Sequence, residues 1–472
     1  MRVRVGGATA IPLVFAVLLA FPVSLIVVQV SLPLALGVGL IFAVVIAAVA
    51  SNQLALYLLV FSMLLGPEVL AGELGRGALL GRGLTFRLDD VLISIIGLAW
   101  LAKTALYREL GLFLRTPLNR PLAAYAFAAA LATGLGMIAG RVTVLGGFLF
   151  VLKYIEYFVI YFIVVNNLRE RRQFERFLLA LLATAAVTSV IGILQIPGGG
   201  RVSAPFEGRG AEPNTFGGYL VLMLALVAGL YLTSQSLRRK FLLALLAVLI
   251  FVPLLFTLSR ASYLALIPLA GALFAWSDRK RFLAGLLAFG LALSPLLAPK
   301  VVADRILFTF TQPFHADQVR IMGVRVDTST SQRLESWHEA ISEDWPKHPI
   351  FGFGVTGYRF LDAQYPRVLT ETGLVGLLAF VWLQMSLFRQ ARAVLRATRD
   401  PLFKGVALGF LAGYIALIGH SIGANTFIIV RIMEPFWFVA GMVVMIPKLE
   451  ASPAPQAPAA RPAPAWRRSV RR

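Results

Sequence analysis

Long apolar stretches recur along the whole chain and constrain its fold more than any other feature. A helix needs roughly 20 apolar residues to cross the hydrocarbon layer of a bilayer, and the chain shows no period-two alternation typical of a β-barrel. With 58% hydrophobic residues, it also holds more apolar side chains than a soluble core of this length can bury. We therefore predict an all-α polytopic membrane protein with about 12–14 transmembrane helices. The predicted spans lie near residues 10–30, 33–50, 52–69, 90–107, 119–139, 144–165, 174–195, 214–233, 240–258, 261–276, 282–299, 368–388, 403–421 and 429–447.

The distribution of basic residues predicts how these spans are threaded. Lysine and arginine gather in alternate connections, and short cytoplasmic loops are the ones that collect them. We therefore expect both termini to be cytoplasmic, with the opening MRVRV leading into a retained first helix. The net charge of +21 then follows from an inner surface attracted to anionic lipid headgroups, and no nucleic-acid partner is expected. The basic connections hold Lys103, Arg108, Arg115 and Arg120; Arg169, Arg171, Arg172 and Arg176; Arg238, Arg239 and Lys240; Arg279, Lys280 and Arg281; and Arg389, Arg392, Arg396, Arg399 and Lys404.

Four parts follow from this threading. Residues 1–299 are predicted to form a helix bundle of about 11 spans, and residues 368–447 the C-terminal transmembrane helices. Between them, residues 300–367 form one large outer loop with short helices, and connections of this length usually serve a function. Residues 448–472 are rich in proline and alanine with terminal arginines, which predicts a disordered basic cytoplasmic tail.

The outer loop contains two distinct segments. TSTSQRLESWHEAISEDW predicts a helix with Thr330 or Ser331 as its N-cap. HPIFGFGVTGY then breaks regular structure with Pro349 and three glycines. We expect it to form a tight loop whose backbone approaches something closely.

Arginines stand beside predicted spans at three other points on the outer face. They are Arg87 in TFRLDD, Arg209 in GRGAEPN and Arg260 in TLSRAS. An arginine near hydrocarbon is costly, so each either extends to the headgroups as an anchor or faces a wet, functional cavity. Guanidinium groups match phosphate oxygens and stay charged, so several of them on one face favour the functional interpretation.

The segments RGAEPNTFGGYL, TLSRASYLAL, RLESWHEAISEDWPKHPIFGFGVTGY and LTETGLVGLLAF resemble, in this order, the O-antigen ligase and polymerase family of bacterial inner-membrane glycosyltransferases. The resemblance implies an undecaprenyl-diphosphate-linked glycan as donor, a periplasmic active site, and inverting transfer without a metal or other cofactor. The acceptor would be the lipid A core in a ligase of lipopolysaccharide biosynthesis, or another lipid-linked glycan in a polysaccharide polymerase.

The same resemblance assigns the donor diphosphate to Arg209 and Arg260, and we add Arg87 and Arg333 as further candidates. Glu212 and Asn214 support this site, because the helix that begins near Asn214 presents a positive N-terminus to a phosphate.

One departure from the family concerns the catalytic base. Ligases of the family carry a His-Asn pair about nine residues before Glu-x-Gly, whereas this chain has Asp362 and Ala363 there. Asp-x-Gln-Tyr, which ends at Tyr365, is similar to polymerase-like members. The candidate bases are therefore Asp362, His338 on the loop helix, and Glu371, which could equally be a helix cap.

The remaining sequence features leave a few alternatives open. His348 precedes a proline and is expected to shape the turn, while His420 is expected to line the outer ends of the last spans. A transporter also has many spans and outward charges, but it usually shows matched halves with charges at the midplane. Only Lys153 and Glu156 lie deep in a predicted span, and their spacing fits a structural pair. No cluster has metal-ligand spacing, so no metal site is predicted.

Overall fold

The structure is a computed structural model that describes residues 52–66, 68–70, 85–87, 90, 92–97, 114–206, 212–297, 299–314, 318–321 and 323–451. The predicted first two spans, much of the span near 90–107 and the predicted tail lie outside these residues. The described helices are α3 (Asn52–Leu65), α5 (Asn119–Ile138), α6 (Val144–Asn167), α7 (Arg171–Gln195), α8 (Pro213–Thr233), α9 (Leu237–Phe256), α10 (Arg260–Trp276), α11 (Lys280–Leu297), α12 (Lys300–Thr311), α13 (Thr328–His338), α14 (Gln364–Ala397), α15 (Pro401–His420) and α16 (Val430–Ala451), with the short turns η1 (Ile196–Gly198), η3 (Glu339–Asp344) and η4 (Trp345–Lys347).

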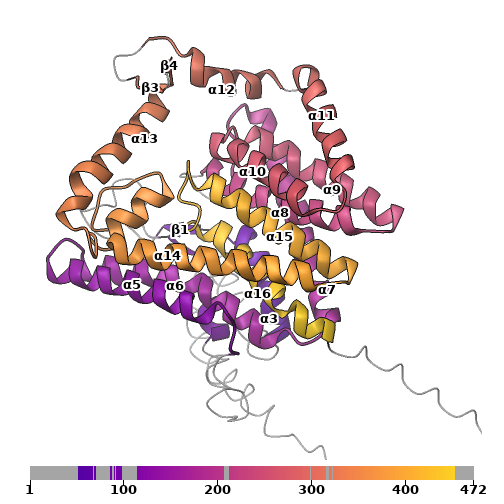
Figure 1. The fold of residues 1–472 in the computed structure, drawn as a ribbon, viewed down its shortest axis with the longest axis horizontal. Coiled ribbons are helices and arrows are strands. Elements are labelled where there is room, and N and C mark those ends of the chain that lie inside the picture. Colours follow the sequence, from indigo (N-terminus) through magenta and orange to yellow (C-terminus); the bar gives the residue numbers. More distant parts are fainter. Residues whose placement is uncertain are drawn as a thin grey trace, which may run out of the picture.

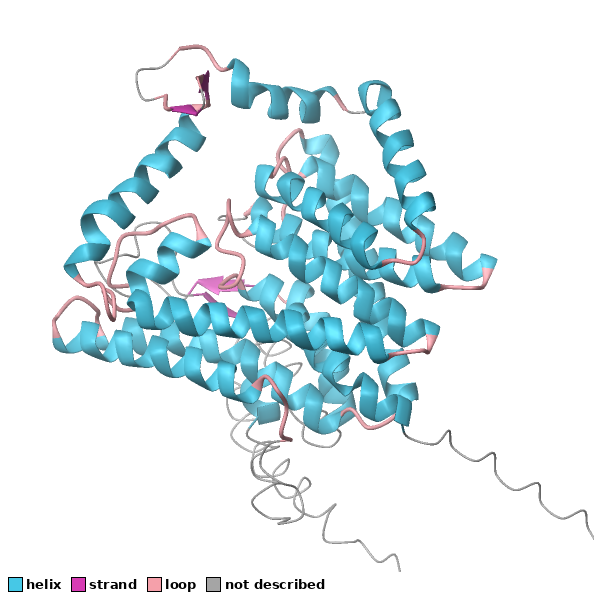
Figure 2. Ribbon diagram, viewed as in Figure 1, coloured by secondary structure: helices cyan, strands magenta, loops and turns pink. Residues whose placement is uncertain are grey.

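Helices dominate the molecule, and the predicted all-α polytopic class is confirmed (Figures 1 and 2). Among the described residues, eight helices are long and apolar enough to cross a membrane, and two shorter apolar helices accompany them. Their bounds follow the apolar stretches closely, since α8 begins one residue before the predicted span and α10 begins at Arg260. The strands in the described part form two small antiparallel hairpins, β1 (Glu68–Leu70) with β2 (Thr85–Arg87) and β3 (Arg320–Ile321) with β4 (Val324–Arg325).

Helix α8 is the most enclosed part of the bundle together with α16. Glycines let its backbone approach α15: a Cβ added to Gly409 would lie 2.6 Å from the Cα of Leu226, and one added to Gly229 would overlap the carbonyl of Gly405. Small residues allow such close contact between membrane helices, where van der Waals packing replaces the hydrophobic effect as the driving force. In contrast, α9 exposes a row of apolar side chains that begins with Leu237 and Phe241, as expected for a face toward lipid.

Ion pairs join the connections at one end of the bundle. Arg171 at the start of α7 donates to Asp400 at 2.6 Å, and Lys404 of α15 contacts Asp278 at 2.7 Å. Asp400 also caps α15 by accepting from the backbone of Leu402. The connections before α7, α11 and α15 thus meet at this end of the bundle.

The connection between α11 and α14 stands above the bundle as an arch of α12, the β3–β4 hairpin and α13 (Figure 1). Hydrogen bonds tie its two sides together: the backbone N–H of Asp327 donates to Thr309 at 2.9 Å, and that of Thr328 donates to the side chain of Gln312 at 2.8 Å. Helix α13 begins at Thr328 with Asp327 in the N-cap position, so the predicted caps Thr330 and Ser331 are wrong. Thr330 instead donates its hydroxyl proton to the carboxylate of Asp327.

Helix α14 contains a break that shapes the end of the arch. It starts at Gln364, earlier than the predicted span, and Gly373 interrupts it with φ of 64°. A side chain at that position would overlap the carbonyl of Ile350, so both the backbone angle and the space require glycine. Glu371 therefore lies just before a kink inside α14, and the interpretation that it begins a helix is wrong.

Candidate active site

Arg260 is the first residue of α10 and contacts the arch at the start of α13. Its Nη1 donates to the carboxylate of Asp327 at 2.7 Å, and 17% of the side chain is exposed. The other two guanidinium nitrogens, Nε and Nη2, are buried and find no hydrogen-bond partner in the described part of the chain. A buried N–H without an acceptor is costly, and it is costlier on a charged group. Arg260 is therefore only partly satisfied by the protein.

Asp327 holds Arg260 in place. Burial alone would raise the pKa of Asp327, but hydrogen bonds from Thr330 and Arg260 outweigh it and hold this pKa below its ordinary value. The carboxylate is therefore ionised at neutral pH. Because Asp327 also precedes α13, this one ion pair fixes the arch to the N-terminus of α10.

Two more arginines surround Arg260, and sequence reasoning did not select either of them. Arg201 follows η1 and donates to the backbone carbonyl of Thr257 at 3.0 Å. Arg305 lies on α12, and its buried Nε has no partner among the described side chains and backbone. Burial and then the charge of Arg305 lower the pKa of Arg201, and burial and then the charge of Arg260 lower that of Arg305. The arginines thus repel one another.

Arg333 on α13 completes what we call the arginine cluster: Arg201, Arg260, Arg305 and Arg333. Its positive charge also acts on Arg305. Arg333 donates from Nη2 to the carboxylate of Asp362 at 2.8 Å, and both side chains are about one-third exposed, at 30% and 27%. A predicted diphosphate ligand and a predicted base are therefore direct partners at the solvent-accessible edge of the cluster.

Two of the predicted supporting residues lie at the N-terminus of α8. Asn214 accepts a hydrogen bond from the hydroxyl of Ser259 at 2.6 Å, and Ser259 is the residue directly before Arg260. Glu212 is the N-cap residue of α8, and its charge acts on Arg201. The N-termini of α8 and α10 thus meet the arginine cluster, and both helix dipoles add positive potential there.

The other predicted donor ligands are not placed by the structure. Arg209 lies outside the described residues. Arg87 is the last residue of β2, but its side chain is not described. Nearby, Asp90 contacts Lys153, which also pairs with Glu156 at 3.2 Å, so the predicted intramembrane pair is present with a third member.

His338 and His348 take different places on the arch. His338 is the exposed last residue of α13 and contacts the hydroxyl of Ser342 at 3.4 Å. His348 lies after η4, where its Nε2 is 3.3 Å from Nη1 of Arg141 and its ring packs edge-on against Phe353. Partial burial, with the charges of Arg141 and Lys347, lowers the pKa of His348. His348 therefore joins the glycine loop to the α5–α6 connection, as expected of a turn residue.

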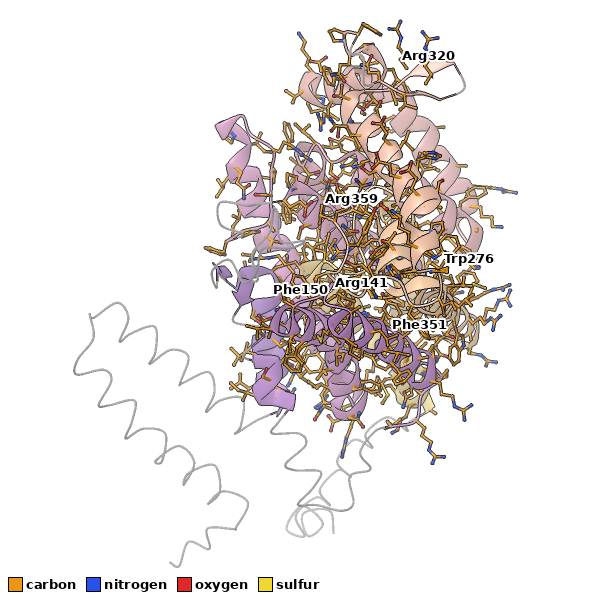
Figure 3. The ribbon with its side chains drawn as sticks, turned by 90° about the vertical axis from the view of Figure 1, so that its left-hand side faces the viewer. Arg141, Phe150, Trp276, Arg320, Phe351 and Arg359 are labelled. Atoms are coloured by element: carbon orange, nitrogen blue, oxygen red, sulfur yellow. The ribbon has the colours of Figure 1, made fainter. Side chains whose placement is uncertain are left out.

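The glycine loop, residues 348–358, approaches the protein's own helices. A Cβ on Gly352 would lie 2.5 Å from the carbonyl of Thr370 in α14, and one on Gly354 would lie 3.1 Å from the carbonyl of Ala132 in α5. Figure 3 shows Arg141 and Phe351 against the bundle, while Arg320 marks the outer end of the arch. The close approach predicted from the glycines therefore docks the arch onto the bundle.

Glu371 is buried beneath this loop. Its carboxylate accepts from Arg367 at 3.0 Å and from the hydroxyl of Tyr154 at 3.2 Å, and it is 3.4 Å from the backbone N–H of Thr356. Three elements thus meet on one carboxylate that is 5% exposed. These contacts hold α14, α6 and the glycine loop together through Glu371.

Tyr365 and His420 connect α14 and α15 to their neighbours. The hydroxyl of Tyr365 donates to the carbonyl of Ile418 at 2.9 Å. His420 is fully buried at the end of α15, with Ser262 on one ring nitrogen and Thr426 on the other. Within the described part of the chain, neither residue makes a hydrogen bond to the arginine cluster. No group of three histidine or acidic side chains that could hold a metal ion occurs within the described ranges.

Comparison with known proteins bears on this arrangement. Residues 245–381 match the family model described as O-Antigen ligase. The matched segment contains Arg260, Arg305, Asp327, Arg333 and Asp362, but it ends before His420 and begins after Asn214. No curated protein gives a significant match to the chain. The predicted resemblance to the O-antigen ligase family is confirmed over residues 245–381, the segment that matches this family model.

Proposed function

We propose that the protein transfers a glycan from a polyprenyl diphosphate, of the undecaprenyl type, to an acceptor hydroxyl at the periplasmic face of a bacterial inner membrane. The family match supports a ligase-type or polymerase-type glycosyltransferase role in general. The observation that carries the proposal is the arginine cluster, where two buried nitrogens of Arg260 have no acceptor among the residues that the structure describes. A diphosphate offers oxygens in the geometry that guanidinium groups bind best.

The chemistry needs stabilisation of the departing diphosphate. The bond between the anomeric carbon and the diphosphate oxygen breaks, and the electron pair stays on the phosphate. Arg260 and Arg305 would stabilise this charge, because their positive charges act on one another and the buried Nε and Nη2 of Arg260 and Nε of Arg305 have no acceptor among the described residues. Four arginines supply the positive charge that a divalent ion brings elsewhere, so the proposed reaction needs no metal.

The acceptor oxygen attacks the same carbon from the opposite side, which inverts the anomeric configuration. Its proton passes to a base, and we assign this role to Asp362 because it lies beside Arg333 at the accessible edge of the cluster. His338 remains the second candidate, since it is exposed on the same helix as Arg333. Glu371 is assigned a structural role because its oxygens are occupied within the bundle.

Two acceptors fit this chemistry. The first is the lipid A core, which a ligase would use. The pair Asp362 and Ala363, standing where ligases have His-Asn, favours a polymerase that extends another lipid-linked glycan. The proposed reaction at the donor is the same in both.

Electrophoresis of surface polysaccharide from a deletion strain tests the proposal. A ligase predicts loss of capped lipopolysaccharide while polymer accumulates on the lipid carrier. A polymerase predicts accumulation of single repeats instead. Complementation with wild-type protein must restore the pattern, and complementation with Arg260→Ala must not. An unchanged polysaccharide pattern in the deletion strain, with no redundant gene product, would contradict glycan transfer and leave a transport role to be tested by substrate uptake.

A further inference from the structure

His420 is buried in the bundle, yet hydrogen bonds connect it stepwise to the arginine cluster. Its Nε2 is 3.2 Å from the hydroxyl oxygen of Ser262. Ser262 donates to the hydroxyl oxygen of Ser259 at 2.8 Å, and Ser259 donates to Oδ1 of Asn214 at 2.6 Å. At the other side of the ring, Nδ1 is 2.7 Å from the hydroxyl of Thr426. We call this series the His420 chain.

One assignment of protons satisfies every contact of the His420 chain. Each of Ser259 and Ser262 has one hydroxyl proton, and Ser262 donates its proton to Ser259. In this assignment Nε2 of His420 donates to Ser262 and Nδ1 accepts from Thr426, so the imidazole is neutral.

The chain determines how the Asn214 side chain is oriented. Because Ser259 donates to Oδ1, the amide nitrogen of Asn214 points away from Ser259 with its two protons. An amide N–H pair at the N-terminus of α8, next to Arg260, is suited to an anion.

Glycines in α8 make room for the chain. A Cβ added to Gly217 would overlap the hydroxyl of Ser262, and one added to Gly218 would lie 3.1 Å from Cε1 of His420. The segment FGGYL therefore brings the backbone of α8 against α10 and α15 at the two residues that carry the chain. Ser259 is also the N-cap of α10, where its hydroxyl accepts from the backbone of Ser262.

We propose that His420 is a positioning residue for the donor diphosphate: acting through Ser262 and Ser259, it aims the amide protons of Asn214 at the anion and holds the α8 and α10 N-termini together. This inference rests on the proposed function. It adds a neutral donor, the amide of Asn214, to the arginines that the resemblance implies.

Binding of undecaprenyl diphosphate to the full chain in nanodiscs tests the inference. Asn214→Ala removes the aimed donor, and Ser262→Ala breaks the chain with a minimal change of volume. Each should weaken binding roughly tenfold, the effect of one charge-assisted hydrogen bond. His420→Phe should do the same, whereas His420→Gln, which keeps a nitrogen donor, should bind close to wild type.

A double-mutant cycle separates positioning from a general loss of structure. If His420 acts through Asn214, the Ser262→Ala, Asn214→Ala double variant should bind no more weakly than Asn214→Ala alone. Tyr414→Phe is the control, because it removes another buried hydrogen bond of α15, from the hydroxyl of Tyr414 to the carbonyl of Gln384. It should lower the melting temperature without changing the affinity for undecaprenyl diphosphate.

The outcomes distinguish this inference from the proposed function. Wild-type affinity in both Ser262→Ala and His420→Phe, with binding lost in Arg260→Ala, would overturn the inference and leave the proposed function intact. Fully additive losses would also overturn it, since they would show that the chain does not act through Asn214. Absence of saturable binding by wild-type protein would overturn both.

Discussion

Arg260 and Arg431 are both arginines at the ends of apolar helices, but the protein treats them differently. Arg431 of α16 is 2% exposed and donates to the backbone carbonyls of Leu64 and Pro205, at 2.9 and 3.0 Å, and of Gly66 at 3.2 Å. Arg260 has one carboxylate partner, and two of its buried nitrogens have no acceptor in the described structure. The comparison suggests a criterion: an arginine whose N–H groups all have protein acceptors is structural, whereas one with buried N–H groups that lack acceptors is a candidate to bind a ligand.

The same distinction holds for whole clusters. Arg367 and Glu371 pair within the bundle, and Tyr154 occupies the second carboxylate oxygen. In the arginine cluster, the positive charges of Arg201, Arg260 and Arg305 act on one another, and Arg260 pairs with Asp327. The first arrangement holds α14 to α6, whereas the second would be stabilised by the proposed diphosphate, which brings negative charge.

The largest effect on activity is expected from Arg260→Met. This change keeps most of the side-chain length and removes the charge next to the leaving group, so transfer should fall on the order of 100-fold to 1000-fold. The melting temperature should fall about as much as in Asp327→Asn, because both changes break the same ion pair, so Asp327→Asn is the matched control for stability. Arg260→Lys should rescue poorly, since an ammonium cannot form the paired hydrogen bonds. Transfer assays on purified protein measure this, and near wild-type turnover would remove Arg260 from the mechanism.

A somewhat smaller loss is expected from Asp362→Asn. The amide keeps the shape and loses the basicity, so turnover should fall about 100-fold while donor binding persists. His338→Ala, changed on the same face of the arch, should be mild. The reverse order of effects would assign the base to His338. Unchanged turnover in both Asp362→Asn and His338→Ala would leave neither residue as the base. Asp362→His should retain measurable transfer if the site is ligase-like.

Arg431→Met applies the same substitution as Arg260→Met to the structural arginine. Several buried carbonyls lose their donor, which should lower the free energy of unfolding by about 3 kcal/mol or more. Thermal unfolding in detergent measures this loss. Equal melting temperatures of wild type and Arg431→Met, together with lost donor binding, would show that Arg431 is a ligand and that the comparison fails.

Asp327→Asn should destabilise the junction of arch and bundle by about 1–2 kcal/mol at neutral pH. The folded state lowers the pKa of Asp327, so its stabilising effect is present above the unfolded pKa of about 3.9 and is lost as pH falls through the lower folded value. The difference in melting temperature between wild type and variant should therefore be constant from pH 5 to 8 and shrink below about pH 4. A difference that shrinks already between pH 5 and 7 would point to another titrating group.

The smallest effect is expected from metal removal. If arginines supply the positive charge at the diphosphate, transfer should continue unchanged in excess chelator. A collapse of activity that Mg²⁺ or Mn²⁺ reverses would contradict the arginine-based account.

Much of the fold follows from the sequence, because apolar length alone determines where membrane helices begin and end. Less of the candidate site does. Arg201 stands in an unremarkable GGGRVS segment, and Arg305 stands on a helix in the middle of a long connection, so only three-dimensional packing brings them to Arg260. The glycines of residues 352–357 correctly predicted a close approach, but they could not show that the approached surface is the protein itself.

The central claim is that the arginine cluster holds the donor diphosphate, and a structure of the full chain in nanodiscs with bound undecaprenyl diphosphate tests it most directly. The account predicts phosphate density within hydrogen-bonding distance of Nε or Nη2 of Arg260, with Arg305 adjacent and Arg431 still bound to its carbonyls. Phosphate density away from Arg260 and Arg305, with both nitrogens of Arg260 still lacking an acceptor, would contradict it.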